Sequence, residues 1–383
     1  MVESGKTLIV VLIRNLPEKS GGIQKGVFQL YDYLRKKGFE IEFVLSSKKE
    51  NISEYDEFKI NHIKFPPIYT YPFTKRYFEY IKQRKNIYNH FKINYTGKKV
   101  IVIAHWAPDF MLLAEIGFKL KYKTLFSFHG PYHTKKFKEL YGRKAIWLRG
   151  FKNKINHINK FVFISNVLYK EGIERCNIPV EKSIVIQNGI VVNNEVSIKK
   201  NNDVVKFVMA TRLVKNKNID FVLESLTILK SKGLKFICDI YGDGTEEESL
   251  RSMITTNNLK GDIFLKGYKA NIDKLLHNYD YYISASLFEG LPRGPLEAIN
   301  NNVIPILSDI PTHREIIPAE VDVFFSLENP YFLADKINKI VNQNENNKMI
   351  REELKDYLCL NFDINIRNAK FKELILTLLL NYH

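Results

Sequence analysis

Residues 206–241 read KFVMATRLVKNKNIDFVLESLTILKSKGLKFICDIY, and this stretch decides the fold of the second half of the chain. It opens with a short apolar run at 206–210 and closes with another at 235–241. Between the two runs, apolar side chains recur at helical spacing on one face: Ile219, Val222, Leu223, Leu226 and Leu229. Short apolar strands on either side of an amphipathic helix are typical of a parallel sheet that helices cover.

The same alternation runs through the whole chain. Further apolar, β-branched runs predict strands at 7–13, 40–45, 99–104, 123–128, 160–164, 183–187, 262–266, 280–285 and 303–308. We therefore predict an α/β protein with two doubly wound domains. In such domains ligands bind beyond the carboxyl ends of the strands, so the loops that follow strands are where functional residues are expected.

A polar stretch, Val192–Asp203, separates the two halves. It predicts a first domain over 1–190 and a second over 204–363, with a C-terminal helix at about 364–383 that packs back onto the first. The first half (1–190) holds 34 basic and 16 acidic residues, a net of +18, and the rest holds 24 and 26, a net of −2. The basic excess of the 383-residue chain thus lies in the first domain and favours an anionic partner there.

Composition and cysteine usage narrow the class of protein. Hydrophobic residues make up 45% and charged residues 26%, which excludes a disordered or collagen-like chain. Cys176, Cys238 and Cys359 are scattered without metal-ligand spacing, as in proteins of a reducing compartment. The apolar runs 8–13 and 374–380 are too short to span a bilayer. We expect a cytoplasmic protein that is soluble or bound to a membrane from one side.

A carboxylate pair follows the predicted strand 280–285, in the stretch SASLFEGLPRGPLEA at 284–298. Glu289 falls in the loop, Pro295 suits the first turn of a helix, and Glu297 lies just inside that helix. Backbone N–H groups at a helix start suit an anionic ligand, and carboxylates accept hydrogen bonds from ligand hydroxyls. Arg212 and Lys217 flank the turn after the strand 206–210, where two cations could neutralise a diphosphate. The alternative is that all four are ordinary surface charges.

Together these residues resemble the retaining family 4 glycosyltransferases with the GT-B fold. Glu289 and Glu297 match that family's E-x7-E signature, and Arg212 to Asp220 resembles its G-R-L-x-x-x-K-G-x-D segment. Thr211 and Asn218 stand here in place of the two glycines of that segment. Residues 186–189 resemble the family's NG segment, although the Asp that usually follows is missing.

The resemblance implies a role for each matching residue. Arg212 and Lys217 would bind the donor diphosphate as leaving group, Glu289 the sugar hydroxyls and Glu297 the ribose. The transfer implied is a front-side displacement in which the leaving phosphate helps to deprotonate the acceptor. The absence of Asp-x-Asp predicts that no metal and no other cofactor is needed. Further donor contacts are expected from Gly290, Leu291 and Asn188.

The first domain offers further candidates. Gly21 and Gly22 precede an amphipathic helix and resemble the family's Gly-rich first loop, although a plain helix start explains them nearly as well. His129 ends the strand 123–128 and resembles the family's active-site histidine. His105 ends the strand 99–104, where a structural histidine is the commoner case. Ser165 and Asn166 follow the strand 160–164 and are further candidates to face the cleft between the two predicted domains.

Basic and aromatic residues mix in the first domain. Residues 119–160 carry twelve Lys or Arg and one acidic residue, Glu139, and a second such stretch includes Phe73, Tyr88 and Phe91. This mixture fits docking on an anionic membrane, with a merely solvated basic face as the alternative. No nucleic-acid-binding signature is present, so nucleic acid is not an expected partner.

The sequence thus predicts a retaining glycosyltransferase in bacterial surface polysaccharide synthesis. It would move a sugar from a nucleotide-diphosphate sugar, expected to be UDP-linked, to a lipid-linked oligosaccharide or glycan at the cytoplasmic face of the plasma membrane. Two alternatives stay open. One is another GT-B enzyme, such as a sugar-nucleotide epimerase, and the other is a non-catalytic basic protein that binds membranes or nucleic acid.

Overall fold

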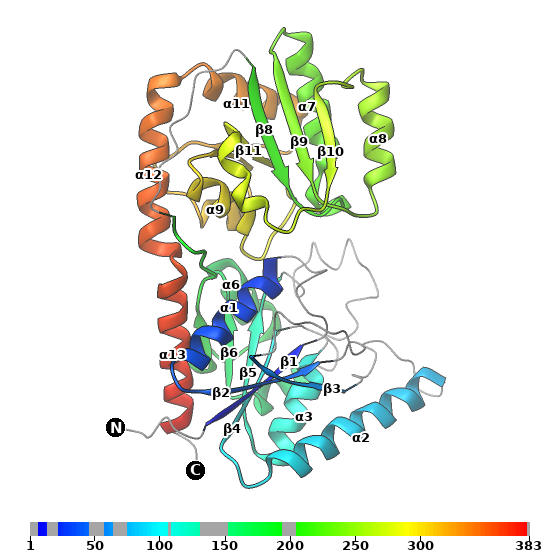
Figure 1. Cartoon of the computed structure of the whole chain (residues 1–383), viewed down its shortest axis with the longest axis vertical. Helices are drawn as coiled ribbons and strands as arrows, with labels where there is room; N and C mark the ends of the chain where they lie inside the picture. Colours follow the sequence, from blue (N-terminus) through cyan, green and yellow to red (C-terminus); the bar gives the residue numbers. More distant parts are fainter. Residues whose placement is uncertain are drawn as a thin grey trace. The chain divides into compact units, whose positions relative to one another are not determined.

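The computed structural model describes residues 7–13, 22–45, 57–63, 75–105, 109–130, 152–193 and 204–380 (Figure 1). The chain divides into two compact units. We call Met1–Asn188 with Asn365–His383 the N-unit, and Gly189–Ile364 the C-unit. The division at Asn188 lies just before the polar stretch Val192–Asp203 in which the sequence placed it, and the last helix belongs to the N-unit.

The N-unit is built on a seven-stranded parallel sheet with the order β3-β2-β1-β4-β5-β6-β7. This order reverses direction between β1 and β4, which defines the point where ligands bind in doubly wound sheets. The strands are β1 (Leu8–Ile13), β2 (Glu40–Leu45), β3 (Lys59–His62), β4 (Val100–Ala104), β5 (Lys123–Phe128), β6 (Lys160–Phe163) and β7 (Ser183–Val185).

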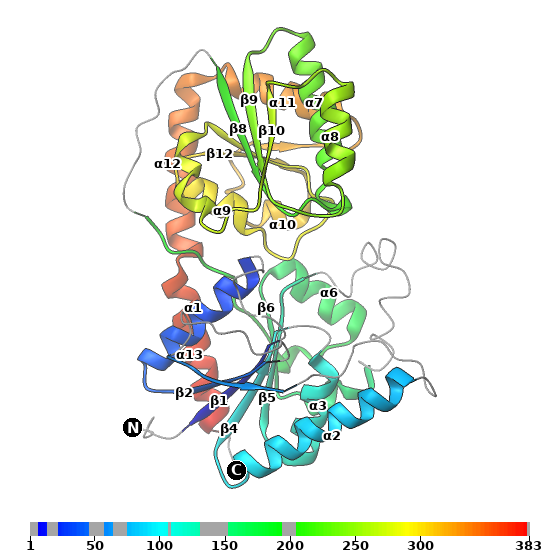
Figure 2. The same cartoon turned by 45° about the vertical axis from the view of Figure 1, so that its right-hand side comes forward.

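Helices cover both faces of this sheet (Figures 1 and 2). One face carries α1 and α13, and the other carries α3, where Phe110 contacts Phe126 edge to face at 5.2 Å between ring centroids. Ser165 begins the helix α6, because its hydroxyl accepts a hydrogen bond from the backbone N–H of Leu168. The helices are α1 (Gly22–Lys36), α2 (Lys75–Tyr95), α3 (Phe110–Leu120), α6 (Asn166–Cys176) and α13 (Ile364–Leu380).

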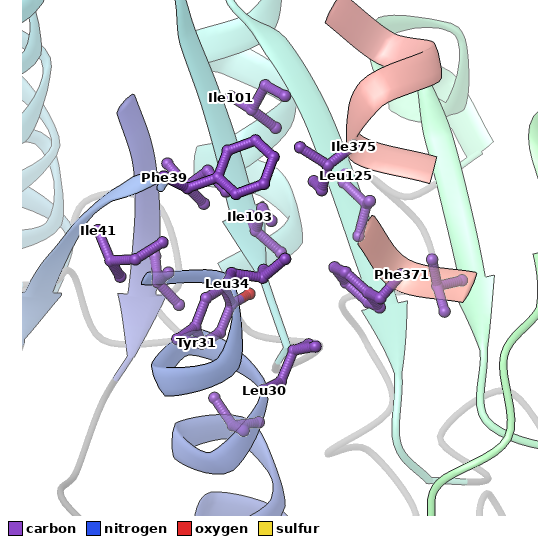
Figure 3. Close-up of a cluster of buried hydrophobic side chains, with 14 of the residues drawn as sticks. Leu30, Tyr31, Leu34, Phe39, Ile41, Ile101, Ile103, Leu125, Phe371 and Ile375 are labelled. Atoms are coloured by element: carbon purple, nitrogen blue, oxygen red, sulfur yellow. The ribbon is translucent and has the colours of Figure 1, made fainter. Parts of the chain in front are cut away.

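The hydrophobic core beneath α1 and α13 contains side chains from both the early and the late part of the sequence (Figure 3). Tyr31 and Leu34 of α1 meet Phe371 and Ile375 of α13 over the strand residue Ile103, all of them at most 3% exposed. Burying one such side chain contributes about 1.5–3 kcal/mol, so the last helix is an integral part of the N-unit.

The C-unit repeats the architecture with a six-stranded parallel sheet in the order β10-β9-β8-β11-β12-β13. The order reverses between β8 and β11. The strands are β8 (Val205–Ala210), β9 (Phe236–Tyr241), β10 (Ile263–Gly267), β11 (Tyr281–Ser284), β12 (Ile304–Ser308) and β13 (Phe324–Phe325). The helices are α7 (Ile219–Ser231), α8 (Glu247–Thr256), α9 (Arg293–Asn300), α10 (Pro311–Arg314), α11 (Pro330–Val341) and α12 (Asn344–Phe362).

The predicted fold class is confirmed: the chain is an α/β protein with two doubly wound domains. Every predicted strand is found, with ends that differ by at most two residues. Two strands were missed. β3 is short and polar at the edge of its sheet, and β13 has only two residues, so neither shows an apolar run.

No helix in the described part of the chain is both long enough and apolar enough to cross a bilayer.

Candidate functional site

The site in the C-unit starts from the loop after β8, and a glycine turn holds this loop in place. Gly242 and Gly244 follow β9 with φ of 143° and 157°, and a Cβ at either position would collide with the backbone of the β8 loop. Leu213 donates its N–H to the carbonyl of Asp243 at 2.8 Å, which fastens the residue after Arg212. The Gly-Asp-Gly sequence is therefore a tight packing turn that fixes the β8 loop.

The same loop ends in a short 3-10 turn, Lys215–Lys217. Asn218 follows with φ of 53°, a left-handed conformation that Asn tolerates better than most residues. Asn218 can therefore occupy the position of one of the two glycines of the family segment. Arg212 is exposed and has no ion-pair partner among the described residues, so its guanidinium is available to a ligand.

Lys217 and Glu289 join the loops that follow β8 and β11. The ammonium of Lys217 donates to Oε1 of Glu289 in an ion pair whose side chains are 13% and 17% exposed. Leu287 donates its N–H to the carbonyl of the buried Asn216 at 2.9 Å, so the backbones of the two loops are also connected. Because β8 and β11 are the two strands at the reversal point, the predicted cation and carboxylate meet there.

Ser286 and His313 are buried polar residues near Glu289. Ser286 donates its hydroxyl to Oε1 of Glu289 at 2.7 Å. Burial alone would raise the pKa of Glu289, but the Lys217 ammonium outweighs it and holds the pKa below its usual value. His313 is fully buried, and its Nδ1 lies 2.8 Å from the carbonyl oxygen of Ser308. Burial lowers the pKa of His313 to about 4, so this residue is neutral near pH 7.

Glu297 lies on the second turn of α9, a helix that begins at Arg293. Its Oε1 accepts a hydrogen bond from Arg293 at 3.3 Å, and the two side chains are 20% and 12% exposed. Tyr282 of β11 packs beneath the start of the helix and donates its hydroxyl to the carbonyl of Ala210 at 3.0 Å. A Cβ at Gly294 would collide with that tyrosine, so a glycine is needed for this close approach.

Gly290 and Leu291 lie in the buried part of the loop before α9. Their backbone N–H groups donate to no residue in the described segments. Pro292, the residue before the helix, has no N–H to offer. The C-unit therefore brings together Arg212, Lys217, Glu289, Gly290 and Leu291 on neighbouring loops of one sheet edge, with Glu297 on the helix α9 that follows.

A second polar cluster lies in the N-unit. His129, 9% exposed, lines a pocket together with His105, Ser127, Asn188 and Arg367. Its Nε2 lies 2.9 Å from Nδ1 of His105 and 3.1 Å from the hydroxyl of Ser127. Burial, together with the nearby Arg367 charge, lowers the pKa of His129 to about 3, so the side chain is neutral.

The remaining candidates of the first domain fall in different places. Asn188 is the last residue of the first segment of the N-unit and lines the histidine pocket. Gly22 is the first residue of α1, and Gly21 lies outside the described residues.

The basic and aromatic stretches are only partly described. Residues 131–151 and Phe73 lie outside the described segments. Phe91, predicted for a membrane-facing surface, is fully buried and contacts Tyr95 at 5.0 Å between ring centroids. That expectation is wrong for Phe91, because its face of α2 packs into the core. Over residues 81–95 of α2, where the side chains are described, the exposed ones are basic, polar or aliphatic and include Ile81, Lys82, Lys85, Lys92 and Ile93.

Several supporting residues were not predicted. Ser286, Asn216 and Arg293 lie inside the quoted motifs, but nothing in a motif distinguishes a supporting side chain from a spacer. His313 could have been found, because it follows the strand 304–308 at the same edge of the sheet as Glu289. Arg367 carries no sequence signal, because it reaches the pocket from the far end of the chain.

In the described segments, no three His, Cys, Asp or Glu side chains are grouped so that they could hold a metal ion.

Comparison with known proteins supplies the family. The model for glycosyl transferases group 1 matches residues 193–356, and the model for glycosyltransferase family 4 matches residues 20–194. The two matches together follow the division of the chain into two units.

Curated relatives are similar over part of their length. An uncharacterized glycosyltransferase of Methanocaldococcus jannaschii is 30% identical over 33% of this chain and 31% of its own. The poly(ribitol-phosphate) alpha-N-acetylglucosaminyltransferase of Staphylococcus aureus is 28% identical over 43% of this chain and 33% of its own. The capsular polysaccharide biosynthesis glycosyltransferase CapH of Staphylococcus aureus is 26% identical over 57% of this chain and 60% of its own. The chain thus spans about a third of the first curated relatives it matches.

Solved structures match over nearly the whole chain. A glycosyltransferase from Rickettsia africae is 21% identical with a TM-score of 0.74, covering 98% of this chain and 99% of its own. HepE from Anabaena, solved in complex with UDP and glucose, is 15% identical with a TM-score of 0.78, covering 96% and 99%. At these identities the likeness shows the fold, which is that of the GT-B enzymes. The chain therefore belongs to the glycosyltransferases, with a glycosyltransferase family 4 domain followed by a group 1 domain in a GT-B fold.

Proposed function

We propose that this glycosyltransferase moves a sugar from a UDP-sugar, with retention of configuration, to a lipid-linked glycan acceptor in bacterial surface polysaccharide synthesis. The observation that carries the proposal is the meeting of Lys217 with Glu289 beside Arg212 at the strand reversal of the C-unit. A diphosphate needs cations and a sugar needs hydrogen-bond acceptors, and this edge of the sheet offers both.

The proposed chemistry assigns a task to each group. Arg212 and Lys217 bind the phosphate oxygens and stabilise the negative charge that grows when the bond from C1 of the sugar to the phosphate oxygen breaks. Fixed donors of this kind contribute about 10²–10³ each in rate. Glu289 accepts a hydrogen bond from a sugar hydroxyl and Glu297 from the ribose.

The acceptor oxygen bonds to C1 on the face that the phosphate leaves, and its proton passes to a phosphate oxygen. The displacement then needs neither a nucleophile nor a base from the protein. This fits the chemistry of these two buried histidines, since pKa values of about 3 for His129 and about 4 for His313 make both side chains weak bases.

Related proteins support the donor and the kind of acceptor. HepE was solved with UDP and glucose, and the first Staphylococcus aureus relative is named for transfer of N-acetylglucosamine to poly(ribitol-phosphate). The second is named for capsular polysaccharide biosynthesis. These names concern those proteins, and they make UDP-sugars and bacterial surface glycans the first substrates to test.

The site of action is proposed to be the inner face of the plasma membrane. The net charge of +18 on residues 1–190 supports attraction to an anionic surface, since each cation close to such a surface adds about 1 kcal/mol. On α2, the exposed lysines Lys82, Lys85 and Lys92 lie on the same helix as the exposed Ile81 and Ile93, a combination that suits contact with lipid headgroups.

A thermal-shift screen across UDP-, GDP-, ADP- and dTDP-sugars identifies the donor, because a ligand that binds the folded state raises the melting temperature. UDP release is then measured with and without lipid-linked acceptors, and NMR of the product gives the anomeric configuration. We expect release only with an acceptor and a product of unchanged configuration. Consumption of UDP-sugar without an acceptor would favour an epimerase, and no release with any acceptor would favour a non-catalytic binder.

A further inference from the structure

Lysines collect at the edge of the N-unit sheet where the strands begin. All seven strands are parallel, so the segments that lead into β4, β5, β6 and β7 meet at the edge opposite the histidine pocket (Figure 1). These segments, residues 93–99, 118–123, 154–160 and 177–183, are called the lysine edge below, and they hold one acidic residue, Glu181. They hold eight lysines: Lys98, Lys99, Lys119, Lys121, Lys123, Lys154, Lys160 and Lys182.

Exposed apolar side chains stand among these lysines. The described part of the N-unit has five large apolar side chains that are exposed, and three of them lie on the lysine edge: Ile93 at 80%, Phe118 at 52% and Val180 at 58%. Ile93 is in the last turn of α2, and the three residues precede β4, β5 and β7, so they are spread along the edge. Apolar side chains that gather on one exposed surface mark contact with a partner or a membrane.

Phe118 and His157 lie in the middle of the lysine edge. Their rings stack at 4.4 Å between centroids, and the ammonium of Lys121 lies 5.2 Å from the centroid of Phe118. Partial burial, together with the charges of Lys154, Lys121 and Lys182, lowers the pKa of His157. The exposed aromatic ring is therefore surrounded by cations from three neighbouring segments.

Two lysines hold the segments of this edge together. Lys160 donates its ammonium to the carbonyl of Glu181 at 2.7 Å. Lys182 donates to the carbonyls of Asn156 at 3.1 Å and Ile158 at 3.0 Å. The segments before β6 and β7 are thus connected, and the positions of Phe118 and its neighbours rest on a fixed support.

Three other lysines are available to a partner. Lys98, Lys99 and Lys121 are exposed and form no ion pair within the described part of the chain. Lys119 differs from them, because it pairs with Glu115 one turn earlier on α3. The edge therefore carries an uncompensated positive charge, which favours an anionic partner.

The mixture of cations and apolar side chains favours a lipid surface as that partner. An anionic bilayer offers phosphates to the ammonium groups and, just below them, an apolar layer that accepts Ile93, Phe118 and Val180. Lysine stems also extend along such a layer while their charges stay in the headgroup region. The outer surface of a nucleic acid duplex offers phosphates without this apolar layer.

We propose that the lysine edge is the surface through which this protein docks on an anionic membrane, with the histidine pocket of the N-unit facing away from the lipid. The inference rests on the proposed function for the membrane as partner, and it adds which surface meets the membrane and how the N-unit is oriented. A strand of six residues spans about 20 Å. β5 therefore keeps the pocket at about that distance from the headgroups, open to substrates from the water.

Sedimentation of the full chain with vesicles tests this docking surface. The wild type should bind vesicles that contain phosphatidylglycerol and stay in solution with vesicles of phosphatidylcholine alone. The triple variant Lys98→Gln, Lys99→Gln, Lys121→Gln removes three exposed charges and keeps most of each side chain. Each cation near an anionic surface contributes about fivefold in affinity, so this variant should bind about 100-fold more weakly.

A matched control removes the same charge from the C-unit. Lys232, Lys235 and Lys260 are exposed there, and their triple replacement by Gln should bind vesicles like the wild type. Phe118→Ala tests the apolar part of the contact. Because Phe118 is about half exposed, its replacement should weaken vesicle binding about 3- to 10-fold.

Equal losses in the two triple variants would overturn the proposal, because binding would then follow net charge and not this surface. Vesicle binding at the wild-type level in the lysine-edge variant would overturn it as well. If Phe118→Ala binds vesicles like the wild type and a DNA duplex competes fully with them, the edge is a general polyanion site and the proposal is wrong.

Two further measurements keep these outcomes clear. All variants should unfold cooperatively and bind UDP like the wild type, since none of the replaced residues lies in the donor-binding loops. Vesicle binding is measured without any sugar substrate. Failure of the proposed transfer reaction would therefore leave the docking result standing, and absence of vesicle binding would remove the docking surface without touching the transfer reaction.

Discussion

The ammonium of Lys217 is paired with the carboxylate of Glu289 across the two loops that follow β8 and β11. The pair is largely shielded from water, and the hydroxyl of Ser286 holds the same carboxylate oxygen at 2.7 Å. The pair thus keeps the two loops at a fixed separation before any ligand binds. In the proposed complex Lys217 also reaches the diphosphate, so one residue orders the site and contributes to the chemistry.

The glycine turn offers a prediction about backbone support. Gly242→Ala should weaken UDP binding and stability, because the new Cβ collides with the carbonyl of Thr211 beside Arg212. Gly261→Ala is the matched control, since Gly261 also has a positive φ, of 95°, but open space around it. Calorimetric UDP titration and urea unfolding should show an extra cost of about 1–3 kcal/mol for Gly242→Ala. Equal effects of the two variants would contradict a packing role for the turn.

Glu297 is predicted to hold the nucleotide from α9. Glu297→Ala should lower UDP affinity about tenfold, the effect of losing one hydrogen bond to a charged group. The fold should survive, because Glu297 and its partner Arg293 both keep some exposure. Glu224→Ala, an exposed carboxylate on α7, should bind UDP like the wild type. Wild-type affinity in Glu297→Ala would remove this residue from the donor site.

Buried neutral histidines predict that acid destabilises the protein. The pKa of His313 is lowered to about 4, whereas an unfolded chain protonates histidine near pH 6.5. Between these values the unfolded state binds the extra proton, so the free energy of unfolding falls as the pH falls, by up to about 1.4 kcal/mol per pH unit. Urea unfolding between about pH 6 and pH 5 should show a shallower pH dependence for His313→Gln. The exposed His277→Gln should keep the wild-type slope.

Metal independence remains a prediction from the missing Asp-x-Asp motif. Transfer by the full chain should continue at an unchanged rate after dialysis against EDTA, because Arg212 and Lys217 supply the positive charge that a metal would bring. Loss of activity that Mg²⁺ or Mn²⁺ restores would mean that these cations do not suffice.

The sequence predicted the elements and the motif residues better than their surroundings. Parallel strands such as 206–210 are buried on both faces and so appear as apolar runs, whereas the polar edge strand Lys59–His62 has no such run. The loop positions of Arg212 and Glu289 followed from the strands they come after.

Partners could not be predicted in this way, because they depend on side-chain direction and packing between distant segments. The pairing of Lys217 with Glu289, 72 residues apart, needed the order of the sheet. The contact between the hydroxyl of Tyr31 and Nε2 of His105, 2.7 Å apart and 74 residues apart in the sequence, needed the position of α1 over the sheet. Phe91 was predicted to lie on an exposed, membrane-facing surface because it stands among lysines, but its side chain belongs to the core.

The central claim is that the C-unit binds the nucleoside diphosphate of the donor through Lys217, and calorimetric titration of the full chain with UDP tests it most directly. Lys217→Met keeps the length of the side chain without its charge, and Lys215→Ala removes an exposed lysine from the same 3-10 turn as a control. We predict that Lys217→Met raises the Kd for UDP about 10- to 100-fold. Lys215→Ala should bind like the wild type, and all three proteins should unfold cooperatively. Equal UDP affinity in wild type and folded Lys217→Met would contradict the claim.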